Sequence, residues 1–337
     1  MPDYYNYIYR QPEDIEVKKK DKKNYILHAS LFIITFITTT IAGAQWITGI
    51  YNQYQFSFFL IGLPYSISIM FIISCHEFGH YFAAQYHKIK STLPFYIPFP
   101  PIPFFLNFGT MGAVIKTKSP IYSKNAMFDI GIAGPLAGFI ACLIVLLYGF
   151  THLPSAGYFF SVHPLYFETG VATAPVEKLV FGNTLLFSFF KLIFIHGSQS
   201  FPPMSEIYRF PYLCVGWFGM FITAMNMIPV GQLDGGHIAY TMFGERNHYK
   251  IALVSFVVLI ILGLIGLAEY IFDLSTNFGW VGWLLWALLL LFIIKLKHPI
   301  VPDYTELDGK RKFLGYISFL ILIISFSPNP FMLTLGK

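Results

Sequence analysis

Charged residues are scarce in this chain. Asp, Glu, Lys and Arg make up 12% of its 337 residues, about half of the roughly 25% found in soluble globular domains. Hydrophobic residues make up 55%, and several apolar runs approach or exceed the roughly 20 residues needed to span a bilayer. The composition excludes a soluble globular protein and predicts an all-α polytopic membrane protein embedded in the lipid bilayer. The net charge of +5 reflects membrane topology, so no nucleic-acid partner is predicted.

Cysteine is also scarce. The three cysteines, Cys75, Cys142 and Cys214, all stand in apolar runs, and no CxxC pattern occurs. This excludes a disulfide-stapled scaffold and the common cysteine-based zinc motifs. We expect the three thiols to pack among the membrane helices.

Two histidines four residues apart stand near the end of a long apolar run, in the stretch His76-Glu77-Phe78-Gly79-His80. On a helix, residues i and i+4 share a face, so one metal ion can take a nitrogen from each imidazole. Glu77 stands beside them, where a carboxylate can accept a proton from water at the metal. Ionisable groups next to a bilayer are costly and tend to be functional. We therefore interpret the stretch as a zinc site rather than a pair of structural histidines.

The apolar runs divide the chain into predicted spanning helices, about six to seven in number. The first follows a lysine cluster and is too long for the apolar part of a usual signal peptide. The predicted helices cover about 25–46, 56–87, 125–150, 212–226, 251–273, 279–296 and 313–327, with a shorter one at 185–194. We expect a cytoplasmic basic tail over 1–24, an intramembrane core over 25–250 and additional C-terminal transmembrane helices over 251–337.

Residues 93–105 carry several prolines and no charge, so they cannot form a regular helix. The segment after them has glycines at 109 and 112 and then the β-branched pair Val114 and Ile115, which favours a short strand with an open edge. Irregular apolar backbone is tolerated at membrane depth only where protein buries it or it lines a watery cavity. We predict a re-entrant β segment near residues 93–116, although an interfacial loop fits the composition equally well.

A helix-breaking stretch follows the fourth predicted helix. Pro229, Gly231 and a glycine pair should interrupt the helix and leave Asn226, Asp234 and His237 on irregular backbone beside the membrane.

The distribution of basic residues orients the chain. With the N-terminus inside, only Lys178, Lys191, Arg209 and Lys337 lie outside, which leaves 18 of the 22 Lys and Arg residues inside. This strong positive-inside bias brings the end of the second helix and the end of the fourth to the same face of the membrane. Asp234 is therefore the best candidate for the third protein ligand that a catalytic zinc site needs.

These motifs resemble the site-2 protease family of intramembrane zinc metalloproteases. The likeness covers most of residues 70–245, including His76–His80, the Gly109–Ile115 stretch, the Gly131–Pro135 stretch and the Asn226–Gly236 stretch. It is closest to the branch without a PDZ domain, because no insertion is long enough to hold one. Gly138 departs from the pattern, since many members have asparagine there.

The resemblance implies a set of site residues and a cofactor. Zinc would be held by His76, His80 and Asp234, with Glu77 as general base. Asn226 would help to bind substrate, and the β segment would also bind it. The β residues concerned are Gly109, Thr110, Met111 and Gly112.

The predicted function is hydrolysis of peptide bonds within or near transmembrane segments of single-span membrane proteins, in a bacterial plasma membrane and on its cytoplasmic side. A membrane zinc protease acting on non-spanning substrates is one alternative. A transporter with a structural metal site is another, but it predicts two related halves, and the sequence has no internal repeat. A protease of the type that cuts prenylated C-termini takes its third ligand from a later glutamate, and the later glutamates here lack such a motif.

Overall fold

The computed structural model describes residues 22–50, 55–100, 107–153, 178–195, 201–274 and 276–334. Most of the predicted basic tail over 1–24 lies outside these residues, as does the end of the proline-rich stretch at 101–106. Much of the segment between the third and fourth predicted helices also lies outside them.

Within the described residues, four helices are long and apolar enough to cross a membrane. They are α2 (Lys22–Thr48), α3 (Phe56–Tyr86), α4 (Lys124–Thr151) and α9 (Asp234–Phe272). The shorter helical elements are α7 (Leu185–Phe194), η1 (Ile207–Arg209), α8 (Pro211–Met227), α10 (Gly282–Leu289), the π-helix η2 (Leu290–Ile294) and α11 (Gly309–Ser325). The predicted all-α polytopic class is confirmed. The expected spanning helices fall on the four long helices, α8, α10 with η2, and α11.

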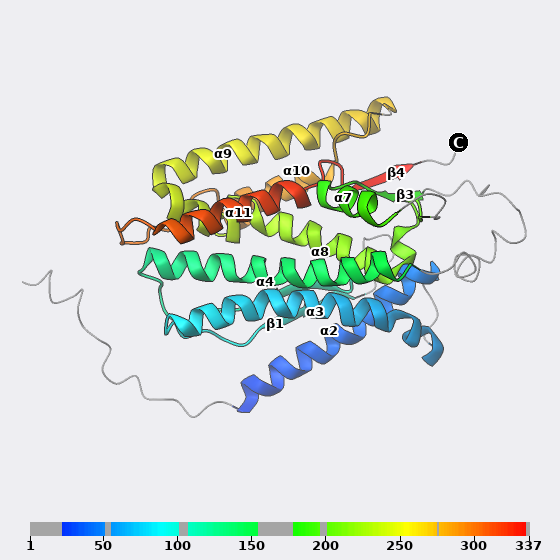
Figure 1. Ribbon diagram of the computed structural model, residues 1–337, viewed down its shortest axis with the longest axis horizontal. Helices are drawn as coiled ribbons and strands as arrows, with labels where there is room; N and C mark the ends of the chain where they lie inside the picture. Colours follow the sequence, from blue (N-terminus) through cyan, green and yellow to red (C-terminus); the bar gives the residue numbers. More distant parts are fainter. Residues whose placement is uncertain are drawn as a thin grey trace, which may run out of the picture.

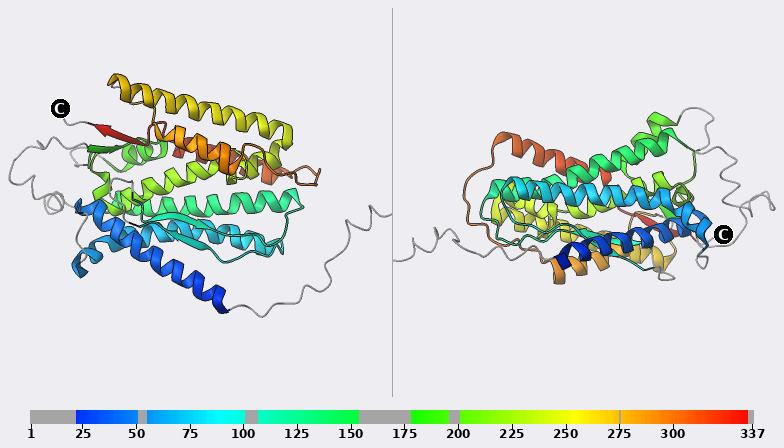
Figure 2. Two further views of the ribbon diagram at one scale, coloured as in Figure 1. Left: turned by 180° about the vertical axis from the view of Figure 1, so that it is seen from behind. Right: turned by 90° about the horizontal axis from the view of Figure 1, so that it is seen from below.

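The helices lie side by side in one bundle, with α2 and α9 at opposite edges and α3, α4 and α8 between them (Figures 1 and 2). The contact between α3 and α4 is close because small residues face each other. A Cβ atom at Gly79 would lie 2.5 Å from the backbone oxygen of Ala133, so only glycine permits this approach. The small-residue stretch of α4 therefore holds this helix against the one that carries the histidine pair.

Two short antiparallel strand pairs accompany the helices in the part of the chain that the structure describes. Strands β1 (Phe95–Pro98) and β2 (Thr110–Val114) pair beside α2 and α3. This agrees with the β segment predicted near residues 93–116. Strands β3 (Lys178–Phe181) and β4 (Phe331–Thr334) pair near the other end of the bundle. We did not predict this second strand pair, because its strands are short and far apart in the sequence.

The break between α8 and α9 occurs where the glycines and proline predicted it. Gly231 has a φ of 54°, and a Cβ atom there would lie 2.0 Å from the Lys295 backbone oxygen, so the loop packs tightly on the end of η2. The prediction that Asn226, Asp234 and His237 lie on irregular backbone was wrong. Asn226 is in the last turn of α8, and Asp234 and His237 are in the first turn of α9, because the interruption is confined to residues 228–233.

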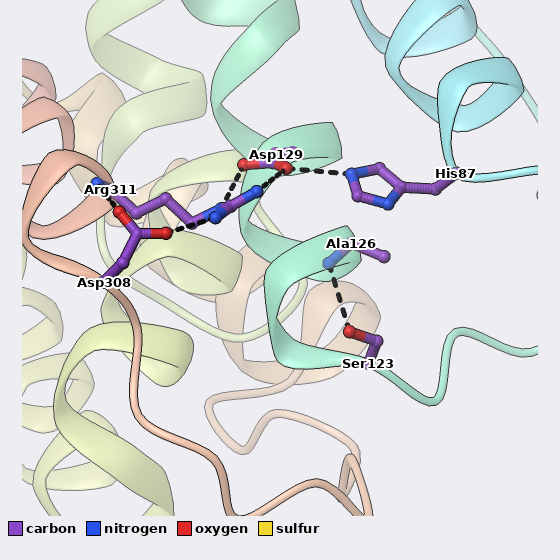
Figure 3. Close-up of polar contacts among 6 residues, drawn as sticks. All are labelled: His87, Ser123, Ala126, Asp129, Asp308 and Arg311. Carbon is purple, nitrogen blue, oxygen red and sulfur yellow. Dashed lines mark hydrogen bonds and ion pairs between the residues drawn. The ribbon is translucent and has the colours of Figure 1, made fainter.

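An ion-pair network joins three helices at one end of the bundle (Figure 3). The Arg311 guanidinium donates from Nε and Nη2 to Asp129 at 2.8 and 2.6 Å, and His87 Nε2 lies 2.8 Å from the same carboxylate. Arg311 also pairs with Asp308, the N-cap of α11. A two-point arginine–carboxylate contact fixes orientation as well as distance. Asp129 therefore ties α4 to α11 and to the end of α3, consistent with a structural role.

Candidate metal centre

Two helices bring three predicted metal ligands together. His76 and His80 lie one turn apart on α3 with their Nε2 atoms 3.1 Å from each other. Asp234 in the first turn of α9 lies 3.4 Å from each of these nitrogens, through Oδ2 and Oδ1 respectively. Both histidines are buried, and Asp234 is largely so. This is the one group of three or more potential metal ligands in the part of the chain that the structure describes.

The donor set fits a zinc ion. Ligand atoms about 2.0–2.1 Å from a tetrahedral zinc lie roughly 3.3 Å apart, close to the separations of 3.1 and 3.4 Å found here. The Nδ1–H of His80 donates to the Ile130 carbonyl at 2.7 Å, so in the neutral ring Nε2 keeps its lone pair. Lone pairs that face one another in a buried site favour a cation between them.

Two glycines of α4 make room for the histidine ligands. A Cβ atom at Gly134 would lie 2.1 Å from Nε2 of His80, and one at Gly138 would lie 3.0 Å from Cβ of His76. The glycines are spaced as residues on one helix face, so α4 presents a nearly flat backbone surface to the metal centre. Gly138, at the position where many members of the resembled family have asparagine, thus lies against the side chain of a predicted ligand.

Glu77 is buried, with 6% of its surface exposed, and follows the first ligand on α3. The backbone N–H of Ile115, just past β2, faces its carboxylate. Strand β1 is anchored to the same helix, because the hydroxyls of Tyr96 and Ser74 lie 2.7 Å apart. The first hairpin therefore lies directly beside the predicted general base.

The hairpin leaves one edge of β2 without a strand partner in the described part of the chain. Phe99 N–H donates to the Gly109 carbonyl, so the backbone groups of alternate β1 residues, including Phe95, point toward β2. Phe95 pairs with Val114, and the register shifts by one residue farther along. By this alternation Val114 uses its N–H within the hairpin, and Ala113 directs its N–H and C=O to the free edge. The open edge predicted from sequence is present, and Ala113 rather than Val114 provides its donor.

The four β-segment residues predicted to bind substrate differ in what they contact. Gly109 packs on α2, where the Thr38 hydroxyl donates to its carbonyl at 2.6 Å, and Thr110 is buried and bonds the Ile97 carbonyl. Met111 is 71% exposed, and a Cβ atom at Gly112 would meet no atom within 4 Å. Gly109 and Thr110 thus hold the hairpin in place, whereas Met111 and Gly112 lie on its open side.

Asn226 lies outside the three-ligand cluster, in the last turn of α8. It is half-buried, and its amide makes no hydrogen bond within the described ranges. His237 also lies outside the cluster. Its Nδ1 donates to Nε2 of His298 at 2.7 Å, and Nδ1 of His298 donates to the Pro299 carbonyl. Burial lowers the pKa of His298, which favours its neutral ring. Sequence reasoning missed this pair, since 61 residues separate the two histidines.

Comparison with known proteins assigns the chain to a family. The family model described as "Peptidase family M50" matches residues 64–265, which include all three potential ligands and Glu77. The chain belongs to peptidase family M50. This is the site-2 protease family that the motifs resemble, and zinc is the metal named for the relatives below.

Plant proteins are among the similar members of family M50. The chain is 28% identical to "Probable zinc metalloprotease EGY2, chloroplastic" of Arabidopsis thaliana over 276 residues, which are 81% of this chain and 43% of the relative. It is also 28% identical to "Probable zinc metalloprotease EGY1, chloroplastic" of the same plant, over 79% of this chain and 43% of the relative. The chain thus spans less than half the length of these relatives.

Proposed function

We propose that the chain is a zinc metalloendopeptidase that cleaves membrane proteins within or next to their transmembrane segments. The observation that carries the proposal is the convergence of two imidazole nitrogens and a carboxylate on one point, with Glu77 buried beside them. Membership of family M50 and the printed names of the relatives support the reaction. The long apolar helices support substrates that lie in the membrane.

His76, His80 and Asp234 would hold the zinc ion. When bound, zinc lowers the pKa of a coordinated water to about 7 and polarises the scissile carbonyl. Glu77 would act as general base, with its carboxylate accepting a proton from water and then delivering it to the amine of the leaving product. Its place on α3, one residue after His76, supports this role. Burial of the carboxylate supports it further, because protein rather than bulk water surrounds the group.

The free edge of β2 would hold the substrate in an extended form. A helical substrate hides its carbonyls in hydrogen bonds, so it must be unwound before cleavage, and an edge strand can bind the unwound segment through main-chain pairing. Ala113 offers one donor and one acceptor on that edge, next to Ile115 and Glu77. The exposed Met111 and the neighbouring Gly112 would contact substrate side chains. The amide of Asn226, which has no hydrogen-bond partner among the described residues, would bind substrate backbone near the metal.

Single-span membrane proteins are the substrates we propose, with the metal centre toward the cytoplasm. The end of α3, the starts of α4 and α11 and the bend in α9 lie at one end of the bundle (Figure 1). Most of the chain's Lys and Arg residues fall in the segments near these helix ends, which supports that end as the inner one. The bacterial plasma membrane expected from the resemblance stays a prediction, because the relatives compared above are chloroplastic.

The deciding experiment compares wild type with Glu77→Gln in proteoliposomes that contain a tagged single-span reporter. The reporter is chosen from single-span fragments that accumulate in membranes containing Glu77→Gln. The substitution keeps size and hydrogen bonding but removes basicity, so cleavage should fall at least about a hundredfold while zinc content stays unchanged. Glu306→Gln, at an exposed glutamate before α11, is the control and should cleave normally.

Three outcomes would change the proposal. Cleavage by Glu77→Gln near the wild-type rate would remove Glu77 from the mechanism. Cleavage of soluble peptides but of no spanning reporter would favour a membrane protease for non-spanning substrates. Bound zinc without cleavage of either kind of substrate would favour a structural metal site in a transporter.

A further inference from the structure

A cavity of about 500 Å³ lies where the second part of α9 meets the segment after η2. The backbone of α9 is non-helical at Gly244, with φ 77° and ψ 170°, so a new helical segment starts at Glu245. The exposed N–H groups and dipole of a helix start favour an anion. The volume lies within the 300–1,000 Å³ range of small-molecule sites. The cavity is lined by Glu245, Arg246, His248, Tyr249, Lys250, Lys297 and His298.

Positive charge dominates the rim of this cavity. Arg246, Lys250 and Lys297 supply three cations and Glu245 one carboxylate, which gives a formal charge of 3 − 1 = +2. Arg246 and Lys250 are four residues apart on one helix face, where like charges repel. Lys297 comes from another segment, and its Nζ lies 5.4 Å from the centre of the Tyr249 ring. None of the three cations forms an ion pair with any residue that the structure describes.

Two buried histidines form the floor. His248 is 1% exposed and His298 is 6% exposed. His298 has partners at both ring nitrogens, but Nε2 of His248 is buried without a hydrogen-bond partner among the described residues. An unpaired buried polar atom is costly and rare in native proteins. A ligand oxygen within the cavity would give this imidazole a partner.

An apolar stripe continues from the cavity along α9. Lys250 lies on the same helix face as Val254, Val257 and Ile261, and all three of these side chains are exposed. A ligand that binds both the cationic cavity and this stripe has an anionic head and an apolar tail. Cationic groups at the end of a spanning helix lie at the level of the headgroups, where anionic lipids attract Lys and Arg.

We propose that this cavity binds the phosphate headgroup of an anionic glycerophospholipid, whose acyl chains lie along the exposed face of α9. The phosphate sits between Arg246, Lys250 and Lys297, over the two buried histidines. The site is separate from the metal centre, although His298, in its floor, pairs with His237 in the first turn of α9. The proposal does not rest on proteolytic activity.

The test measures lipid binding to the purified full-length chain in detergent, by native mass spectrometry with phosphatidylglycerol and with phosphatidylcholine. Wild type should bind phosphatidylglycerol at least about tenfold more tightly. Each cation near the membrane surface is worth roughly a fivefold change in affinity. The triple variant Arg246→Gln, Lys250→Gln, Lys297→Gln should therefore lose about a hundredfold in affinity for phosphatidylglycerol.

A matched control removes the same charge elsewhere, through Lys90→Gln, Lys118→Gln and Lys310→Gln at exposed lysines. It should keep selective binding, and zinc content should be unchanged in both triples. If the triple variant at the cavity (the pocket triple) does not fold, the single variants Lys250→Gln and Lys297→Gln replace it. Each should lose roughly fivefold in affinity for phosphatidylglycerol. Two results would overturn the site: an equal loss of phosphatidylglycerol affinity in the two triple variants, or equal affinity of wild type for phosphatidylglycerol and phosphatidylcholine. Binding of soluble glycerol 3-phosphate that is lost only in the pocket triple, without lipid selectivity, would overturn the lipid source and assign the site to a soluble phosphate ester.

Discussion

Replacing Gly134 with alanine adds one methyl group where α4 passes the ring of His80. The new Cβ atom would lie 2.1 Å from Nε2 and 2.4 Å from Cδ2 and Cε1 of the ring. Non-bonded heavy atoms settle at about 3.5–4.0 Å, so the ring or the helix must move by more than about 1 Å. Zinc–ligand distances tolerate only about 0.2 Å. We therefore expect His80 to be lost as a ligand.

The expected loss of zinc affinity can be judged from what it costs to disturb a metal ligand. Losing a group that orients a metal ligand typically lowers metal affinity 10–100-fold, and displacing the ligand itself should cost at least as much. We expect Gly134→Ala to weaken zinc binding by at least about a hundredfold. Helix propensity acts in the opposite direction, because alanine stabilises a helix interior by roughly 1 kcal/mol relative to glycine. Without the clash, the variant would therefore be more stable than wild type.

Zinc affinity is measured by chelator competition on detergent-purified protein, with thermal unfolding as the check on folding. Gly138→Ala is a milder change, because its Cβ atom would lie 3.0 Å from Cβ of His76. It should lower zinc affinity less than Gly134→Ala does. Gly309→Ala has no atom within 4 Å and should bind zinc normally. Wild-type affinity in Gly134→Ala, or a larger loss in Gly138→Ala than in Gly134→Ala, would refute the geometry on which the metal centre rests.

The remaining predictions concern the ligand set, the ion-pair network and the topology. Asp234→Ala should remove bound zinc, whereas His237→Ala should retain it, as measured by metal analysis of the purified variants; the reverse pattern would mean that the third ligand is wrong. Asp129→Asn breaks the two-point contact with the arginine of α11 and should destabilise the folded state by about 2 kcal/mol, which lowers the thermal midpoint. Glu306→Gln, in an exposed pair, should change the midpoint little. A cysteine placed at Lys118 should react with membrane-impermeant reagent from the cytoplasmic side only, and labelling from outside would invert the proposed orientation.

Much of the helical frame could be predicted because a bilayer restricts what the chain can do. Apolar runs must form helices with internally satisfied backbones, so the short helix expected over 185–194 appears with those bounds as α7. The pairing of His76 with His80 follows from helical spacing alone. Asp234 could be added because the charge distribution brought two distant helix ends to one face.

The sequence could not predict contacts between residues that lie far apart in the chain, because neither residue carries a local pattern that points to the other. The hydrogen bond that orients His80 goes to the backbone carbonyl of Ile130, and any residue type could supply that oxygen. Asp129 and Arg311 are 182 residues apart, so neither predicts the other from sequence. The space that Gly134 leaves for a histidine ring is likewise visible only once α3 and α4 are packed.

The register of the first hairpin decides which variant tests substrate binding. The shift in register turns the N–H of Val114 toward β1 and leaves Ala113 facing the free edge. Proline is tolerated on an edge strand where its missing N–H faces outward. Ala113→Pro should therefore keep the hairpin, membrane insertion and zinc content while it removes the donor offered to substrate.

A spanning reporter should consequently be cleaved at least about tenfold more slowly by Ala113→Pro, since main-chain pairing would lose one hydrogen bond in apolar surroundings, worth on the order of 1–3 kcal/mol. Ala113→Ser keeps the N–H and should cleave normally. Val114→Pro breaks the pairing with Phe95 and should disturb the hairpin itself, which limited proteolysis can detect. Normal cleavage by Ala113→Pro would exclude strand pairing at this position, and the hairpin would then serve only to cover Glu77.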